Sequence, residues 1–269
     1  MLDLDAYFAR IGYTGPRAPT LETLRGLTAA HAQAIPFENL DVLLGRPIEL
    51  APEALFDKLV LRRRGGYCFE QNGLLLQVLE QLGFSVRPLS ARVRIDRARG
   101  ETPPRTHVFL RVALGEEVWL TDVGVGGLSL TAPVRFDLEG EQPTLHEPRR
   151  LVREGDLWFH QARLGDTWSD VCEFTGEEMP RIDREVANWF TSAHPGSHFR
   201  ARLIVARAAP GGRRLTLVNG ELKSRGRDGV AETRPVGSPE SLLAVLAGEF
   251  GLVFPPETRF GPPGSPWPR

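Results

Sequence analysis

The sequence predicts an α+β protein, because two apolar patterns follow one another along the chain. Up to residue 83 the apolar side chains recur at intervals of three or four, and from Phe84 they alternate with polar ones as in strands. The 269 residues, 41% of them hydrophobic, suffice for one large domain or two to three packed subdomains. We expect a helical bundle over 1–83, an antiparallel β segment over 84–188 and a mixed C-terminal segment over 189–269.

Three helices are expected in the first segment. Thr20 is placed to cap a helix that continues through Leu21, Leu24 and Leu27. A second helix opens at Pro52, since proline suits the first helical position. The third opens near residue 68, continues through an apolar run to residue 82 and ends at a glycine, which adopts the left-handed conformation that stops helices.

Strands are expected where β-branched and aromatic residues alternate with polar ones. These places are 93–95, 108–112, 118–120, 151–152, 158–162 and 171–174. Beyond Asn188 the pattern predicts a loop, two strands at 201–206 and 215–218, and a helix over 239–250. The last nine residues, GPPGSPWPR, are expected to form a flexible tail.

The composition excludes several classes of partner. Lys and Arg number 33 against 34 Asp and Glu, and a formal charge of −1 gives no net field to bind a nucleic acid. No apolar run approaches the roughly 18 residues of a membrane span, and the N-terminus is acidic where a signal peptide is basic. Cys68 and Cys172 lie too far apart for a zinc site and are too few for a disulfide scaffold. We expect a cytoplasmic protein without a metal, nucleic-acid or membrane partner; the sequence leaves the oligomeric state open.

The segment Arg64–Glu70, RGGYCFE, joins a glycine pair to Cys68 at a predicted helix start. Unpaired N–H groups and the helix dipole favour an anion at that place, so we expect a lowered thiol pKa and N–H groups able to receive an oxyanion. Glu38 and Arg64 are candidates for an ion pair that braces the glycine turn, with an ordinary surface role as the alternative for each. From the spacing alone, a buried structural cysteine is an equal alternative.

A nucleophilic cysteine needs a base, and His107 is the best placed of the six histidines because it begins the alternating strand 106–114. Asp122 follows on the next strand. A hairpin turn at 114–115 places the two residues directly opposite each other, and a turn at 115–116 makes them diagonal neighbours on one face. In both registers the carboxylate can fix the imidazole tautomer. A structural histidine and a turn carboxylate explain each residue separately, but the combination with a helix-start cysteine favours catalysis.

At these residues the chain resembles the arylamine N-acetyltransferase family. The matching motifs, in order, are IPFENLD at 35–41, RGGYCFE at 64–70, TH at 106–107, DVGVGG at 122–127, NWFTSAHP at 188–195 with Ser197 and Phe199, and EFGL at 249–252. The resemblance spans most of the chain. One departure is Ala193-His194, where small hydroxyl residues are expected, and it leaves the substrate contacts of the lid open.

The resemblance implies an enzyme that transfers acetyl from acetyl-CoA, its co-substrate, to an arylamine, arylhydrazine or hydrazide by a ping-pong route. The fold it implies is a helical bundle, a β-barrel-like middle and an α/β lid, with a cysteine-protease-like or transglutaminase-like core. Cys68 would be the nucleophile, His107 the base and Asp122 the orienting carboxylate. These are the residues that the spacing also selects, and no metal is required.

Aromatic residues near the nucleophile are candidates for a pocket that binds a flat aryl group. We select Phe37, Phe69 and Phe109, with Phe69 first because it adjoins Cys68. Core packing explains these phenylalanines equally well.

The glycines after Asp122 are candidates for contacts to the phosphates of CoA. Because glycine has no side chain, the backbone N–H groups of Gly124, Gly126 and Gly127 can approach an anion closely. A turn or bulge is the alternative explanation.

Two other activities use the same three residues. An amide synthase would close an intramolecular amide on a biosynthetic thioester and would be indifferent to acetyl-CoA. A cysteine amidase or peptidase would use water in place of the amine. A non-catalytic binding module is disfavoured, because a reactive thiolate is prone to oxidation.

Overall fold

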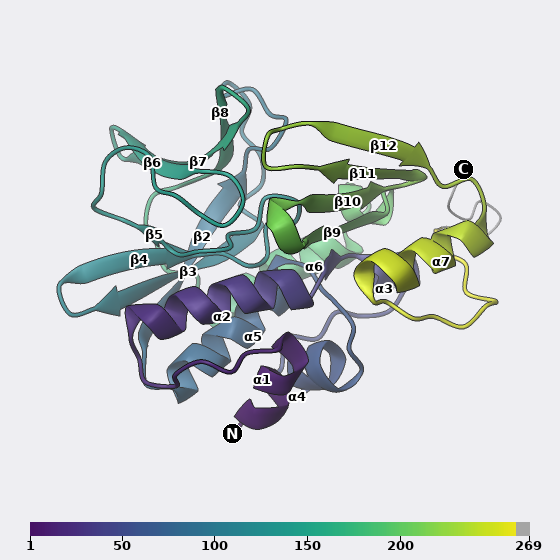
Figure 1. Cartoon of the computed structure of the whole chain (residues 1–269), viewed down its shortest axis with the longest axis horizontal. Helices are drawn as coiled ribbons and strands as arrows, with labels where there is room; N and C mark the ends of the chain where they lie inside the picture. Colours follow the sequence, from purple (N-terminus) through teal and green to yellow (C-terminus); the bar gives the residue numbers. More distant parts are fainter. Residues whose placement is uncertain (262–269) are drawn as a thin grey trace.

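The computed structural model describes residues 1–261 and contains a helical layer and two antiparallel sheets (Figure 1). In spatial order the seven-stranded sheet consists of β5 (Val134–Arg135), β4 (Glu117–Thr121), β3 (His107–Leu114), β2 (Ser85–Val93), β8 (Thr167–Phe174), β7 (Leu157–Leu164) and β6 (Arg149–Glu154). The five-stranded sheet consists of β1 (Phe37–Glu38), β9 (Ile204–Ala208), β10 (Arg214–Val218), β11 (Glu221–Arg225) and β12 (Ala231–Pro235). The helices are α1 (Leu4–Ile11), α2 (Leu21–Ala34), α3 (Leu40–Leu43), α4 (Pro52–Phe56), α5 (Cys68–Gln81), α6 (Arg181–Ala193) and α7 (Pro239–Phe250), with short π or 3-10 turns η1 (Asp57–Leu61), η2 (His198–Arg200) and η3 (Pro210–Gly212).

The α+β prediction is confirmed: helices come first, a barrel-like antiparallel sheet follows, and a smaller sheet with α7 forms the lid. The three predicted helices are present. Thr20 caps α2 by accepting a hydrogen bond from the amide of Thr23, Pro52 is the first residue of α4, and the left-handed Gly83 (φ +86°) follows α5. The second predicted helix changes to π geometry in η1.

Helix α1 was not predicted, although Asp3 caps its first turn and the left-handed Gly12 ends it. Strands β11 and β12, which are rich in charged residues, were not predicted either.

The loop predicted after Asn188 is wrong, because α6 continues to Ala193. Three large apolar residues of α6, Ile182, Val186 and Trp189, are exposed, and the residues it buries are small or polar. Apolar periodicity therefore does not mark the buried face of this helix.

The division into segments at 83/84 and 188/189 remains a prediction. The second boundary lies within α6. Strand β1, in the helical segment, pairs with β9 of the lid through Phe37 opposite Ala206. Apart from Gly261, the tail predicted to be flexible lies outside the described residues.

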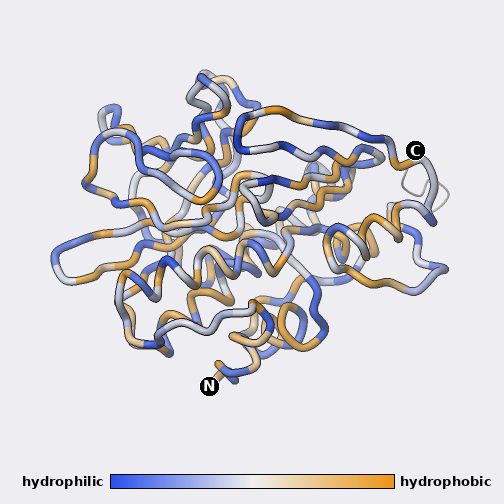
Figure 2. Tube along the Cα trace, viewed as in Figure 1, coloured by the Kyte–Doolittle hydropathy of each residue, from blue (hydrophilic) through white to orange (hydrophobic). Residues whose placement is uncertain are grey.

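Separate apolar cores fill the spaces between these layers. One lies between the helices and the β3–β4 hairpin, with Leu24 and Leu74 packed near Val112. A second fills the concave side of the larger sheet, and a third joins α7 to the smaller sheet. Figure 2 shows α7 among the most hydrophobic elements and hydrophilic residues at the outer loops. Within residues 1–261, no helix is both long and apolar enough to cross a bilayer.

We predict that Thr20→Ala lowers the free energy of unfolding by about 1 kcal/mol, because the first turn of α2 loses a side-chain acceptor. Urea denaturation followed by circular dichroism measures the change. Thr14→Ala is the matched control, since Thr14 is exposed in the preceding loop. Equal stabilities of the two variants would contradict the capping role.

Candidate active site

Cys68 is the first residue of α5, with its side chain directed toward the beginning of β3. Its thiol lies 3.6 Å from the carbonyl oxygen of Thr106, and the residue is 6% exposed. The preceding residue, Tyr67, has extended backbone angles, and its amide donates to the carboxylate of Glu70 at 3.0 Å. The amide of Glu70 in turn donates to the carbonyl oxygen of Tyr67 at 3.0 Å, and together the two bonds fix the direction in which α5 begins.

The glycine pair before Cys68 is required by close packing. A Cβ on Gly65 would overlap the carbonyl oxygen of Pro36, and one on Gly66 would lie 2.6 Å from a carboxylate oxygen of Glu70. The backbone of this turn therefore approaches the chain before β1 more closely than any other residue type permits.

A network of buried charged groups surrounds the turn and confirms the expected pairing of Glu38 with Arg64. Its members are Glu38, Asp41, Lys58, Arg64 and Glu70. The Arg64 guanidinium lies 2.6 Å from Glu38 and 3.2 Å from Asp41, while the Lys58 ammonium lies 2.8 Å from Asp41 and 2.6 Å from Glu70. Removing one member would leave another charge buried without its partner, which is costly. The network therefore couples the glycine turn to α3 and η1.

His107 and Asp122 meet at the open end of the β3–β4 hairpin. Leu110 pairs with Thr121 and Leu114 with Glu117, which is the register of the later turn, at 115–116. The earlier turn is thus wrong, because the left-handed Gly115 opens the two-residue turn. As diagonal neighbours, His107 and Asp122 form a hydrogen bond of 2.7 Å from Nε2 to Oδ2, and both are 1% exposed.

The other oxygen of Asp122 is held by two donors that fix its orientation. The side-chain amide of Asn72 and the backbone amide of Gly124 each donate to Oδ1 at 2.9 Å. Asn72 follows Cys68 by four residues on α5, so both side chains lie on one helix face. The helix that carries the thiol therefore also orients the carboxylate.

The charges of this group reinforce one another. Burial alone lowers the pKa of His107, but the Asp122 carboxylate and the contacts with Cys68 raise it to about 10. Burial alone raises the pKa of Asp122, and His107, Asn72 and Gly124 offset this and keep it below its usual range. The imidazole is consequently charged at neutral pH. Its Nε2 hydrogen-bonds to the carboxylate, and its Nδ1 is available to interact with the thiol.

The aromatic candidates separate into two places. Phe37 and Phe69 lie in the apolar cluster that contains Cys68, and Phe109 lies in the core of the larger sheet, where it packs edge-on against Phe174. Phe199, from η2, joins the first group, with its ring centroid 6.1 Å from that of Phe37. Phe199 is partly exposed, and it was not among the pocket residues predicted from the sequence.

The glycine segment after Asp122 lies against Cys68. A Cβ on Gly124 would be 2.7 Å from the Cα of Cys68, so this position tolerates no side chain. The amides of Gly124 and Gly126 already donate to Asp122 and Ser129. A contact from either amide to phosphate would need an exchange of partner, and the prediction of phosphate contacts for Gly124, Gly126 and Gly127 stays a prediction.

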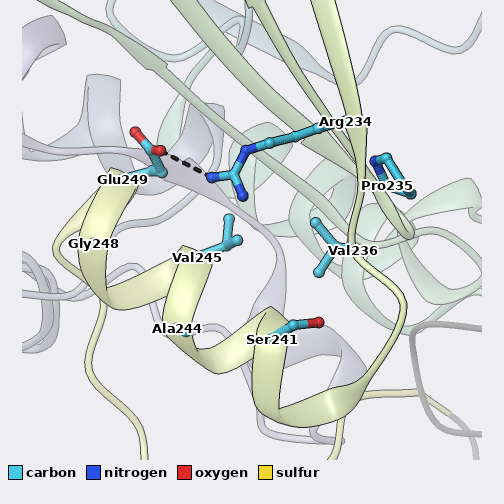
Figure 3. Close-up of a pocket in the computed structure, with 8 residues that line it drawn as sticks. All are labelled: Arg234, Pro235, Val236, Ser241, Ala244, Val245, Gly248 and Glu249. Atoms are coloured by element: carbon cyan, nitrogen blue, oxygen red, sulfur yellow. Dashed lines mark hydrogen bonds and ion pairs between the residues drawn. The ribbon is translucent and has the colours of Figure 1, made fainter.

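Two cavities among the described residues lie in different parts of the fold. One, of about 410 Å³, adjoins the site, because Thr106 lines it together with Met179 and Phe190. The other, of about 260 Å³, lies between β12 and α7, where Arg234 and Glu249 pair at 3.0 Å (Figure 3). None of the candidate site residues lines this second cavity.

Comparisons with known proteins agree with this geometry. A sequence model of the N-acetyltransferase family matches residues 20–258. An arylamine N-acetyltransferase of Mycolicibacterium smegmatis is 45% identical over 93% of this chain and 92% of its own length. The chain belongs to the arylamine N-acetyltransferase family.

Solved structures of the family share its fold. The arylamine N-acetyltransferase of M. tuberculosis matches with a TM-score of 0.89 and 44% identity, over 93% of each chain. The Mycobacterium marinum enzyme, solved in complex with CoA, matches with a TM-score of 0.88 and 42% identity, over 93% of this chain and 92% of that one. These matches confirm the family and the fold inferred from the motifs.

Asn72, like Phe199, is a residue of this site that sequence reasoning missed. The available signal was that Gln71 and Asn72 extend the polar run that begins at Glu70, directly before the apolar part of α5. Both are fully buried. Among residues 1–261, no group of three or more His, Cys, Asp or Glu side chains is arranged to hold a metal ion.

We predict that Asn72→Ala lowers kcat about tenfold or more, because Asp122 loses one of the two donors that orient Oδ1. Steady-state assays with acetyl-CoA and an arylhydrazine measure it. Gln77→Ala on the same helix is the control and should keep normal kcat, since Gln77 is only partly buried. Unchanged kcat in Asn72→Ala would remove Asn72 from the positioning of Asp122.

The raised pKa of His107 predicts a pH dependence of stability. In the folded protein His107 keeps its proton up to its raised pKa of about 10, whereas in the unfolded chain it loses the proton near its ordinary pKa of 6.5. The stabilisation from this group is therefore complete below pH 6.5 and is lost as pH rises toward 10. Asp122→Asn should flatten this decline, measured by urea denaturation across that range. Asp183→Asn, at an exposed carboxylate, should keep the wild-type slope. Parallel curves for all three proteins would refute the assignment.

Proposed function

We propose that this chain transfers an acetyl group from acetyl-CoA to the nitrogen of arylamines, arylhydrazines or hydrazides through an acetyl-Cys68 intermediate. The supporting observation is the buried 2.7 Å bond between His107 and Asp122, with the thiol of Cys68 at the helix start beside the imidazole. Family membership and the CoA complex of the M. marinum relative support acetyl-CoA as the donor.

In the first half-reaction, the Cys68 thiolate attacks the thioester carbonyl. A carbon–sulfur bond forms to Cys68, the bond to the CoA sulfur breaks, and CoA leaves with the proton from His107. Backbone N–H groups at the start of α5 are placed to stabilise the oxyanion. The site then contains acetyl-cysteine and a neutral imidazole.

In the second half-reaction, the neutral imidazole is the base. Acetylation removes the negative charge of Cys68, which is one of the causes that raise the pKa of His107, so the imidazole can exist unprotonated at this stage. The amine nitrogen attacks the acetyl carbonyl, its proton moves to His107, and the Cys68 thiolate leaves. The imidazolium–thiolate pair is restored, and Asp122 keeps the ring in one orientation throughout.

We propose that Phe37, Phe69 and Phe199 form the wall for the aryl group, since all three lie in the apolar cluster around Cys68. Phe109 supports the ring of His107 from the sheet core, at a centroid distance of 6.5 Å. We further propose a cytoplasmic location, which two free cysteines favour because reducing compartments keep thiols unpaired.

We predict that brief exposure to acetyl-CoA, without an acceptor, adds one acetyl group to the protein and that Cys68→Ala abolishes this addition. Intact-protein mass spectrometry measures it. Cys172→Ala is the matched control and should acetylate normally, because Cys172 is fully buried and burial raises the pKa of its thiol.

Addition of an arylhydrazine should then remove the acetyl group and release the acetylated hydrazine. Acetylation that persists in Cys68→Ala would contradict the proposal. Rapid loss of the acetyl group to water alone would favour the hydrolase, and no acylation by acetyl-CoA would favour the amide synthase.

A further inference from the structure

Three arginines converge on one buried carboxylate where the two sheets meet. They are Arg149 on β6, Arg214 on β10 and Arg225 on β11, and with Glu147 they form what we call the arginine cluster. Arg214 contacts the Glu147 carboxylate at 2.6 and 3.2 Å, and Arg225 lies 3.6 Å from it. Arg149 contacts the same carboxylate and donates to the carbonyl of Leu128 at 2.7 Å. The cluster thus links the larger sheet to the lid.

The cluster carries an excess of positive charge in a place with little water. The side chains of Arg149, Arg214 and Arg225 are 0%, 2% and 18% exposed, and that of Glu147 is 8% exposed. One carboxylate balances one of the three guanidinium groups, so two positive charges are left uncompensated. Consistent with this, burial together with Arg149 and Arg225 lowers the pKa of Arg214 to about 10 despite the opposing effect of Glu147.

The neighbouring titratable groups do not supply the missing negative charge. His160 accepts a hydrogen bond from Arg149 at 3.3 Å, and burial and the charge of Arg149 lower its pKa to about 3, so it is neutral. Burial and the charge of Arg214 likewise lower the pKa of His146 to about 4. The Asp122 carboxylate in the active site acts to raise the pKa of His160, but its two oxygens already accept hydrogen bonds from His107, Asn72 and Gly124.

Two donors of the cluster also lack acceptors. Nε of Arg149 and Nη1 of Arg214 are buried, and neither has a hydrogen-bond partner within the described part of the chain. A buried donor without an acceptor is destabilising, and a guanidinium donor more so. The unmet charge and the unmet donors belong to the same cluster, and an anion supplies what both require.

We propose that the arginine cluster is a binding site for a small inorganic monovalent anion of the size of chloride. The side chains close around the carboxylate and only Arg225 is appreciably exposed, so the ligand is small and enters from the β11 side. Because the arginines come from both sheets, the anion stabilises the contact between the lid and the larger sheet. The proposal is independent of the acetyl-transfer chemistry at Cys68.

The test is thermal unfolding of the full chain at constant ionic strength, with chloride replacing gluconate. We expect saturable stabilisation, with an upward shift in Tm of about 2–5 °C. Arg225→Gln should remove most of the shift. Lys223→Gln is the matched control, because it removes one positive charge from an exposed position two residues away on the same strand and should leave the shift unchanged.

Crystals soaked in bromide give a second measurement that does not depend on a variant. An anomalous peak among Arg149, Arg214 and Arg225 is the expected result. The proposal is overturned if the peak is absent there, or if chloride and gluconate give the same Tm. Acetylation of Cys68, measured separately, is expected with or without chloride, so the two proposals fail by different observations.

Discussion

The buried hydrogen bond between His107 and Asp122 is the interaction on which the site depends. It joins a strand start to a strand end, in a place where an isolated charge of either sign would be costly. The carboxylate stays ionised because the imidazole, Asn72 and Gly124 satisfy it, and the imidazole stays protonated because the carboxylate and Cys68 face it. Each charge is stable only while the others are in place, so the arrangement is fixed before a substrate arrives.

Helix α5 connects this pair to the rest of the fold. It provides the thiol at its first residue and Asn72 one turn later, and Gly124 lies against its backbone at a distance that admits no side chain. The start of the helix is in turn fixed by the glycine turn and by the buried network that includes Arg64 and Glu70. The precision of the site therefore comes from packing over many residues beyond Cys68, His107 and Asp122 themselves.

Much of the fold was predictable because local rules applied. Thr20 and Pro52 mark helix starts through their own side chains, and strict alternation marks β3 and β4. Helix α6 was not predictable in this way, since it exposes Ile182, Val186 and Trp189 and buries small or polar residues. In the site, the three candidate residues followed from type and position, whereas Asn72 and Phe199 matter through contacts made by distant parts of the chain.

The sequence by itself determined the order of helices and strands, the family motifs, and the placement of a cysteine at a helix start, because these depend on residues close together in the chain. The tertiary structure decided the rest. The hairpin register depends on which turn the packed sheet accepts, the charge of His107 depends on burial beside Asp122, and the arginine cluster exists only where strands of two sheets meet. Spacing along the chain determines local conformation, but burial and the pairing of charges are properties of the assembled fold.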